Sequence, residues 1–240
     1  MKRLLLGPHA VTEGLRAAPD RLAVVYSDSE PGPAVVEVLR VARAADVRCE
    51  TRDRSELDRL AQGLRHQGVI AIAGDYPYLH LDELLASAGE RPLLVALDEI
   101  TDPHNFGAIV RSAVALGAAG VITLKDRAAP VTAAVVRASA GATELARITR
   151  VTNLARTLAQ LRESGMQIVG LDAEGDVELH ALDYPVAGRV LVVGSEGQGL
   201  RRLVRAQCDA LTRIELGGRL QSLNAAVAAG IAIYESLRRR

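Results

Sequence analysis

The most constraining feature of this sequence is a series of short, continuous apolar runs in its last 148 residues, separated by stretches of helical spacing. Continuous apolar strands that alternate with helices are typical of a parallel sheet covered by helices on both faces. We therefore predict an α/β domain over residues 93–240. Its predicted strands are 93–97, 121–124, 167–171, 190–193 and 210–215, and its predicted helices are 107–116, 131–141, 153–164, 200–206 and 222–237.

The preceding part of the chain also alternates between strands and helices. Apolar runs predict strands at 22–26 and 69–73 and a short strand or loop around Cys49, and helical spacing predicts helices at 34–45, 55–64 and 81–87. Glycine and proline then interrupt the pattern at 74–77 and 89–92. We expect a small α/β domain over 1–74, a linker over 75–92 and the larger domain over 93–240.

Several classes of protein are excluded by what the sequence lacks. No apolar run approaches the roughly 18 to 20 residues that a membrane-spanning helix needs. Only three leucines precede Gly7, too few for the apolar core of a signal peptide, so we expect a cytoplasmic protein. Cys49 and Cys208 lie far apart, which favours reduced thiols over a disulfide framework or a zinc site.

Charge and aromatic content argue against a protein that coats nucleic acid indiscriminately. The formal net charge is zero, and 2% of the residues are aromatic, which leaves little for base stacking. Positive charge is nevertheless concentrated locally, because Lys125–Arg156 contains six basic side chains and two acidic ones. Nearly all of the basic residues are arginines, which bind phosphate through two parallel hydrogen bonds.

Three loops next to the predicted strands carry most of the polar residues that could take part in ligand binding or catalysis. They span Asp98–Gly107, Gly194–Gly199 and Gly217–Asn224, and the third one opens the last helix. Loops at the carboxyl ends of parallel strands are where open α/β sheets bind ligands. We therefore expect the functional site at this edge of the sheet.

Two other interpretations of these loops are weaker. The glycine spacing of the second loop matches neither a dinucleotide-binding nor a Walker motif, and Glu196 between the glycines would repel a pyrophosphate. That loop better suits a ligand without phosphates. The acids Asp98, Glu99 and Asp102 with His104 lack the spacing of a zinc or calcium site, so a solvated loop is favoured over a metal site.

Taken together, the three loops resemble a known family. LDEITDPHNFGAIVRSA, LVVGSEGQGL and RIELGGRLQSLNAAVAAGIAIYE are similar, in order and spacing, to the three motifs of the SpoU (TrmH-like) branch of the SPOUT RNA 2′-O-ribose methyltransferases. The N-terminal GPHAVTEGL and HQGV resemble the small substrate-binding domain of the ribosomal-RNA guanosine branch, which is similar to an RNA-binding ribosomal protein.

The resemblance implies a fold, a reaction and an assembly. The C-terminal parallel-sheet domain would form a deep trefoil knot, an exception to the rule against knots, and the protein would be a homodimer. The reaction would be S-adenosylmethionine-dependent 2′-O-methylation of a ribose, expected to be a guanosine in 23S ribosomal RNA. The alternatives are a tRNA ribose methyltransferase and a non-catalytic RNA-binding protein on the same fold. Gln221 argues against the tRNA alternative. We expect no metal and no membrane partner.

The resemblance also implies roles for particular residues. The expected cofactor-binding residues are Gly194, Glu196, Gly197, Ile214, Leu223 and Asn224, and the expected catalytic residues are Arg111, Asn105, Glu196, Ser222 and Asn224. Because arginine gives up a proton reluctantly, we expect Arg111 to clamp a phosphate and orient the hydroxyl, and rank a role as base second. Asn105 and Glu196 would tie the first two loops together and orient Arg111, whereas Ser222 and Asn224 would cap the last helix. Glu215 stands where the family usually has a proline.

The last helix supports the expectation of a dimer, because alanines and apolar side chains surround it on nearly every face. Such a helix must be buried all round, and a second subunit would cover the side that its own domain leaves open. For an RNA substrate, local arginine density, including Arg201, Arg202 and Arg205, would supply the phosphate attraction that the neutral net charge does not. With so few aromatics, we expect the protein to grip folded RNA by its backbone and 2′-hydroxyls.

Overall fold

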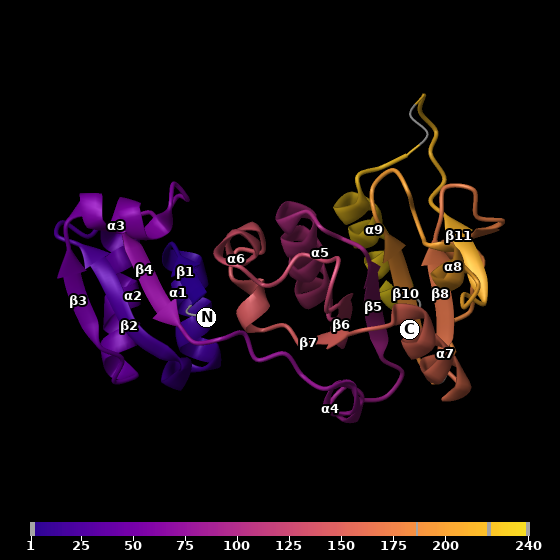
Figure 1. Cartoon of the computed structure of the whole chain (residues 1–240), viewed down its shortest axis with the longest axis horizontal. Coiled ribbons are helices and arrows are strands. Elements are labelled where there is room, and N and C mark those ends of the chain that lie inside the picture. Colours follow the sequence, from indigo (N-terminus) through magenta and orange to yellow (C-terminus); the bar gives the residue numbers. More distant parts are fainter. Residues whose placement is uncertain (1–2, 186, 220–221, 239–240) are drawn as a thin grey trace. The chain divides into compact units, whose positions relative to one another are not determined.

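The computed structural model describes residues 3–185, 187–219 and 222–238, and it divides the chain into two compact units (Figure 1). The first unit comprises Met1–Pro77 and Pro130–Leu145, and the second comprises Tyr78–Ala129 and Ala146–Arg240. The chain therefore passes between the units three times, once within the expected linker 75–92. Gln221, on which the preference for ribosomal RNA partly rests, lies outside the described residues.

The first unit is built on a four-stranded sheet with the order β1-β4-β2-β3. Its strands are β1 (Arg3–Leu6), β2 (Leu22–Asp28), β3 (Cys49–Arg52) and β4 (Val69–Ala73), and its first three helices are α1 (Pro8–Ala17), α2 (Pro33–Ala44) and α3 (Arg54–Ala61). β2 and β3 are parallel, whereas β4 is antiparallel to β1 and β2. Helices α1 and α2 each begin with a proline directly after a glycine, the arrangement that proline favours at a helix start.

Residues 130–145 fold against the N-terminal sheet, although the sequence placed them in the second domain. Helix α6 (Ala133–Ala138) packs on β1, and the 3-10 turn η2 (Ala142–Glu144) follows it. Arg3 and Glu144 form a two-pronged ion pair, with side chains 6% and 8% exposed. The ring of Tyr76 covers the Arg3 guanidinium, and its hydroxyl donates to a carbonyl of η2 (2.8 Å). This buried pair explains why the segment belongs to the first unit.

The second unit confirms the predicted α/β fold with a parallel sheet. Seven strands lie in the order β7-β6-β5-β10-β8-β11-β9, and all of their pairings are parallel. They are β5 (Leu93–Asp98), β6 (Gly120–Leu124), β7 (Ile148–Val151), β8 (Gln167–Leu171), β9 (Val177–Glu178), β10 (Arg189–Gly194) and β11 (Ala210–Arg213). The trefoil knot stays a prediction.

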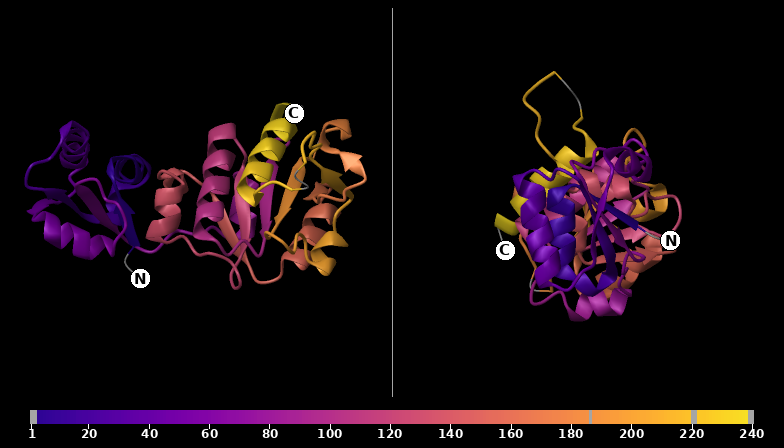
Figure 2. Two further views of the ribbon diagram at one scale, coloured as in Figure 1. Left: turned by 90° about the horizontal axis from the view of Figure 1, so that it is seen from above. Right: turned by 90° about the vertical axis from the view of Figure 1, so that its left-hand side faces the viewer.

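Helices cover both faces of this sheet, as the continuous apolar strands predict. Leucines of α4 (Leu81–Ala86) and α7 (Leu154–Glu163) share one core cluster with Val204 of α8 (Arg202–Arg205) and with alternate residues of β5, β6, β8 and β10. The other face carries α5 (Pro103–Leu116) and α9 (Ala225–Arg238), which pack side by side (Figure 2). Within the described part of the chain, no helix is long and apolar enough to span a membrane.

Several predicted element bounds were wrong in informative ways. The predicted helix 107–116 begins earlier, at Pro103, because Asp102 caps it by accepting from the backbone N–H of His104 (2.9 Å). The predicted helix 222–237 begins later, at Ala225, where Asn224 precedes the first turn. The short strands β1 and β7 and helix α1 were not predicted, because four-residue strands are too short to show a period.

Candidate active site

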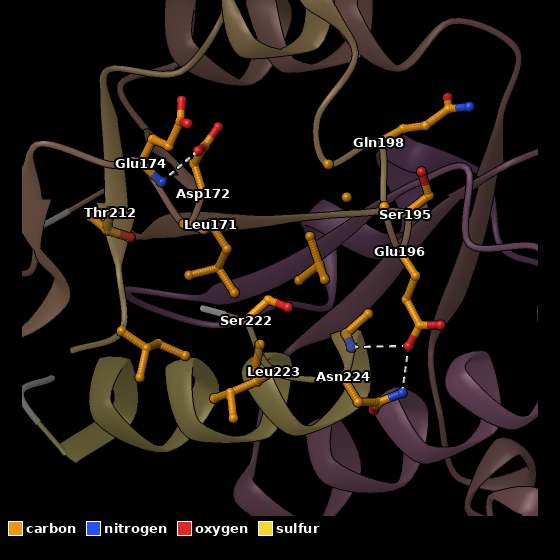
Figure 3. A pocket seen from close by; sticks show the side chains of 18 of the residues that line it. Leu171, Asp172, Glu174, Ser195, Glu196, Gln198, Thr212, Ser222, Leu223 and Asn224 are labelled. Atoms are coloured by element: carbon orange, nitrogen blue, oxygen red, sulfur yellow. Dashed lines mark hydrogen bonds between the residues drawn. The ribbon is translucent and has the colours of Figure 1, made fainter. Parts of the chain in front are cut away.

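The carboxyl ends of three neighbouring strands, β5, β10 and β8, meet at one edge of the second sheet. The strand order reverses at β5, which has β6 on one side and β10 on the other, and open α/β sheets bind ligands at such a point. A cavity of about 730 Å³ lies at this edge (Figure 3). It is lined by residues 171–174, 193–199 and 222–225 together with Arg205, Thr212, Ile214, Leu216 and Ala228.

One wall of the cavity is the glycine loop, Gly194–Gly199, whose tight path depends on its glycines. A Cβ at Gly194 would lie 2.3 Å from the carbonyl carbon of Gly199, a main-chain atom that cannot move aside. The Gly199 N–H donates to the Ser195 carbonyl (2.9 Å) and closes the loop on itself. Gly197 and Gly199 adopt left-handed conformations, with φ of 81° and 65°. Three of its six residues are glycines, so main-chain groups form part of this wall of the cavity.

Asn224 joins the first loop, the glycine loop and the last helix. Its side-chain amide donates to Asn105 Oδ1 (2.9 Å) and to Glu196 Oε1 (2.5 Å), as Figure 3 shows for Glu196. Its own Oδ1 accepts from the backbone N–H groups of Ala226 (3.0 Å) and Val227 (3.2 Å), which confirms that it caps α9. Three segments that lie far apart in the sequence therefore converge on one amide.

Arg111 lies on α5 and is exposed to solvent. Its side chain makes no hydrogen bond or ion pair with another described residue, so it is free to meet an external anion. The two side chains expected to orient it, Asn105 and Glu196, instead bond to Asn224. They tie the first and second loops together indirectly, and an orienting effect on Arg111 stays a prediction.

The structure brings most of the expected site residues together. Those that line the cavity are Gly194, Glu196, Gly197, Ile214, Ser222, Leu223 and Asn224. Asn105 is buried and reaches the cavity edge through Asn224, whereas Arg111 is not part of the lining. Ser222 lines the cavity, but no described hydrogen bond makes it a cap of α9.

Sequence reasoning missed the polar residues that follow β8. Asp172 and Glu174 line the cavity, and Asp172 forms an ion pair with Arg205 of α8 and accepts from the Glu174 N–H (2.9 Å). In Figure 3 their side chains lie across the cavity from Glu196. The position alone could have indicated them, because β8 is a neighbour of β10 and its carboxyl end must reach the same edge.

The interpretation of the acids after β5 as a solvated loop was wrong for Asp98. Its side chain is fully buried and paired with Arg201, and Asp102 serves as the cap of α5. Over residues 3–185, 187–219 and 222–238, no group of three histidines, cysteines or acids could hold a metal. Both cysteines are free thiols, and burial raises the pKa of Cys208 to about 12, so it is no nucleophile.

Family models match both parts of the chain. The model of the SpoU rRNA Methylase family matches residues 92–234. The model for RNA 2′-O ribose methyltransferase substrate binding matches residues 4–79. The two matches together span nearly all of the described chain.

Curated proteins of similar sequence extend over the whole chain. It is 46% identical, over 99% of its length, to an uncharacterized tRNA/rRNA methyltransferase of Mycobacterium sp. (strain KMS), of which it covers 76%. It is 41% identical to the 23S rRNA (guanosine-2′-O-)-methyltransferase RlmB of Pseudomonas aeruginosa, over 98% of this chain and 95% of that protein.

Solved structures show the same architecture. The SpoU methyltransferase AviRb from Streptomyces viridochromogenes, in complex with the cofactor AdoMet, superposes with a TM-score of 0.81 at 27% identity and covers 99% of this chain and 90% of that one. The A. aeolicus TrmH/SpoU tRNA modifying enzyme superposes with a TM-score of 0.57 at 30% identity. It covers only 67% of this chain and 82% of that one.

Proposed function

The chain belongs to the SpoU rRNA methylase family, and on this premise we propose that it methylates the 2′-oxygen of a guanosine ribose in 23S ribosomal RNA. It is an RNA methyltransferase, and S-adenosylmethionine is its cofactor. The guanosine and the 23S RNA are inferred from the RlmB relatives, whose names state that specificity.

The observation that carries the proposal is the convergence of three loops on Asn224 beside a cavity of about 730 Å³. That volume lies within the roughly 300 to 1,000 Å³ typical of small-molecule sites. The lining combines a cradle of glycine main chain with the apolar side chains Leu171, Ile214 and Leu223. This combination suits a nucleoside without phosphates, and so the residues present fit S-adenosylmethionine.

We assign cofactor binding to Gly194, Glu196, Gly197, Ile214, Leu223 and Asn224, all of which line the cavity. The cofactor, when bound, supplies an activated methyl group on a sulfonium. The chain must place a ribose hydroxyl about 3 to 3.5 Å from that methyl carbon, in line with the bond that breaks. It must also let the hydroxyl lose its proton.

Arg111 is the residue that we assign to the RNA side of the reaction. It is exposed on α5 and its guanidinium has no partner among the described side chains, so it can bind a phosphate oxygen bidentately and orient the neighbouring hydroxyl. An arginine holds its own proton tightly, so a role as base ranks second. Asn105, Glu196 and Asn224 hold the loops around the reacting groups, and Ser222 lines the same cavity.

Ribosomal RNA is favoured over tRNA because of the first unit. The RlmB relative matches 98% of the chain, whereas the tRNA modifying enzyme of A. aeolicus covers 67%. The substrate-binding family model matches residues 4–79 of this chain, and this match supports an RNA of the kind that the RlmB relative modifies. The name of the Mycobacterium relative includes both tRNA and rRNA, so tRNA stays the alternative substrate. A ribosomal-RNA substrate also supports a location in the cytoplasm, which we include in the proposal.

A homodimer is supported by an apolar stripe on α9. Val227, Ile231 and Tyr234, spaced as one helix face, are 51%, 43% and 57% exposed. Large apolar side chains that gather on one face mark an interaction surface. We propose that a second copy of the chain covers this stripe.

The test is to map 2′-O-methyl groups in 23S ribosomal RNA and in tRNA from a strain that lacks this protein. One guanosine of 23S RNA should lose its methyl group, and complementation with the wild-type gene should restore it. Loss of a tRNA methyl group with intact ribosomal RNA would overturn the choice of substrate. Restoration of the methyl group by an Arg111→Ala variant would contradict the role assigned to Arg111.

A further inference from the structure

A buried carboxylate stands beside the start of the glycine loop. Asp98 is the last residue of β5, its side chain is 0% exposed, and it pairs in register with Gly194 of β10. A buried carboxylate is costly unless its oxygens are paired. Among the described residues, the hydrogen bonds and ion pairs of the Asp98 carboxylate are all made with Arg201.

The contacts between Asp98 and Arg201 fix both the main chain and the side chain of the arginine. The Arg201 backbone N–H donates to Oδ2 (2.9 Å), its Nε donates to Oδ1 (2.7 Å), and its Nη2 lies 2.6 Å from Oδ1. Arg201 lies two residues after Gly199, where the glycine loop ends. Asp98 therefore holds the start of the loop by strand pairing and its end by its carboxylate.

A second acid and a second arginine complete the arrangement. Arg201 Nη1 lies 3.2 Å from Glu99 Oε1, and Arg127 Nη1 lies 2.7 Å from the same oxygen. Glu99 and Arg127 both have left-handed backbones, with φ of 57° and 58°, a conformation that residues other than glycine keep only where their surroundings impose it. The Arg201 guanidinium is thus held between two carboxylates rather than left loose at the surface.

Besides the Asp98–Arg201 pair, the end of the glycine loop is anchored by Leu200, which is buried in the core cluster. The loop is closed on itself by the Ser195–Gly199 pairing, and Gly194 leaves no room for rearrangement. Glu196 contacts the last helix through Asn224 and the Ala225 N–H (3.4 Å). A shift of the loop end would therefore move the cavity wall and Glu196 together.

We infer that Asp98 and Arg201 are positioning residues of the methyl-transfer site, since they lock the end of the glycine loop in the place where its main chain meets the cofactor. This inference rests on the proposed function. Neither residue lines the cavity, so replacing either one removes no direct contact with the cofactor. Displacements of about 1 Å in such a wall can cost roughly a hundredfold in rate.

The variants that test this role are Arg201→Gln, Arg201→Lys and Asp98→Asn. The matched control is Arg162→Gln, because Arg162 is exposed on α7 and makes no side-chain hydrogen bond or ion pair with other described residues. Each full-length protein is titrated with S-adenosylmethionine by calorimetry and assayed for the KM of cofactor and of RNA. Hydrogen exchange of the amides of residues 195–201 reports the order of the loop directly.

Arg201→Gln is expected to raise the Kd and KM for S-adenosylmethionine about tenfold or more and to speed exchange of the loop amides. The cofactor affinity of Arg201→Lys should fall between those of Arg201→Gln and the wild type, and the cofactor affinity of the control should match the wild type. Cofactor affinity within twofold of the wild type in both Arg201→Lys and Asp98→Asn would overturn the inference, even if Arg201→Gln fails to fold. If the wild-type protein itself binds no S-adenosylmethionine, the proposed function fails instead.

Discussion

The buried Arg3–Glu144 ion pair makes a sharp prediction about which residues fold together. Glu144→Gln removes one charge from a pair whose side chains are 6% and 8% exposed and leaves the Arg3 guanidinium buried without its counterion. Breaking a buried pair by removing one partner costs about 3 to 5 kcal/mol. The cost should fall on the first unit, because both partners belong to it.

Hydrogen exchange followed by mass spectrometry measures this cost locally. In the Glu144→Gln variant, amides of β1, β4 and residues 130–145 should lose roughly two to three and a half orders of magnitude of protection, since each 1.4 kcal/mol is a factor of about ten. Amides of β5 and β10 should keep their protection. The matched control is Glu37→Gln, which breaks the exposed Arg40–Glu37 pair and should leave every peptide nearly unchanged.

Two results would refute this reasoning. If residues 130–145 alone lost protection while β1 and β4 kept theirs, the segment would not fold cooperatively with the N-terminal sheet. If β5 and β10 lost protection as much as β1 did, the pair would not act within the first unit. A double variant, Arg3→Met with Glu144→Leu, should recover much of the loss, because well-packed apolar groups can replace a buried pair.

Three further predictions concern the site and the assembly. Arg111→Ala should abolish methyl transfer, while its Kd for the cofactor, measured by calorimetry, should stay within about tenfold of the wild-type value. A larger loss of cofactor affinity would contradict the assignment of Arg111 to the RNA side. Gly194→Ala should raise the cofactor Kd at least about tenfold, because the new methyl group meets the main chain of Gly199. The control Gly217→Ala should leave the cofactor Kd unchanged, because a Cβ there meets no atom within 4 Å. In sedimentation velocity, Ile231→Asp should convert the dimer to monomers, whereas the control Leu203→Asp on α8 should leave the dimer intact. An intact dimer in the Ile231→Asp variant would exclude the α9 stripe as the interface.

The second unit was predictable because its strands are buried on both faces. A run such as Leu93–Leu97, with every side chain buried, shows as a short continuous apolar block, which is typical of a strand covered on both faces. The loops were predictable for a related reason, since Gly194 stands at the end of such a block and Asn224 stands directly before a helix. The short β1 and α1 escaped prediction because three leucines after an arginine, followed by an uncapped helix start, give no distinct pattern.

What the sequence did not predict depends on partners that are distant along the chain. Glu144 is 141 residues from Arg3, and Asp98 is 103 residues from Arg201. Each of these side chains looks like an ordinary surface charge until the fold brings its partner to it. Gly141 is a similar case, because a Cβ there would lie 2.8 Å from Ala10 Cα, a contact that only the folded first unit creates.

The central claim is methyl transfer to a guanosine 2′-oxygen, and the most direct measurement is transfer by the purified protein. Wild-type protein is incubated with isotopically labelled S-adenosylmethionine and unmodified 23S ribosomal RNA or tRNA transcripts, and the digested nucleosides are separated and identified by mass spectrometry. We predict label in 2′-O-methylguanosine from 23S RNA and none in the Arg111→Ala reaction. Label on a base, label in tRNA alone, or no label in either RNA would contradict the account.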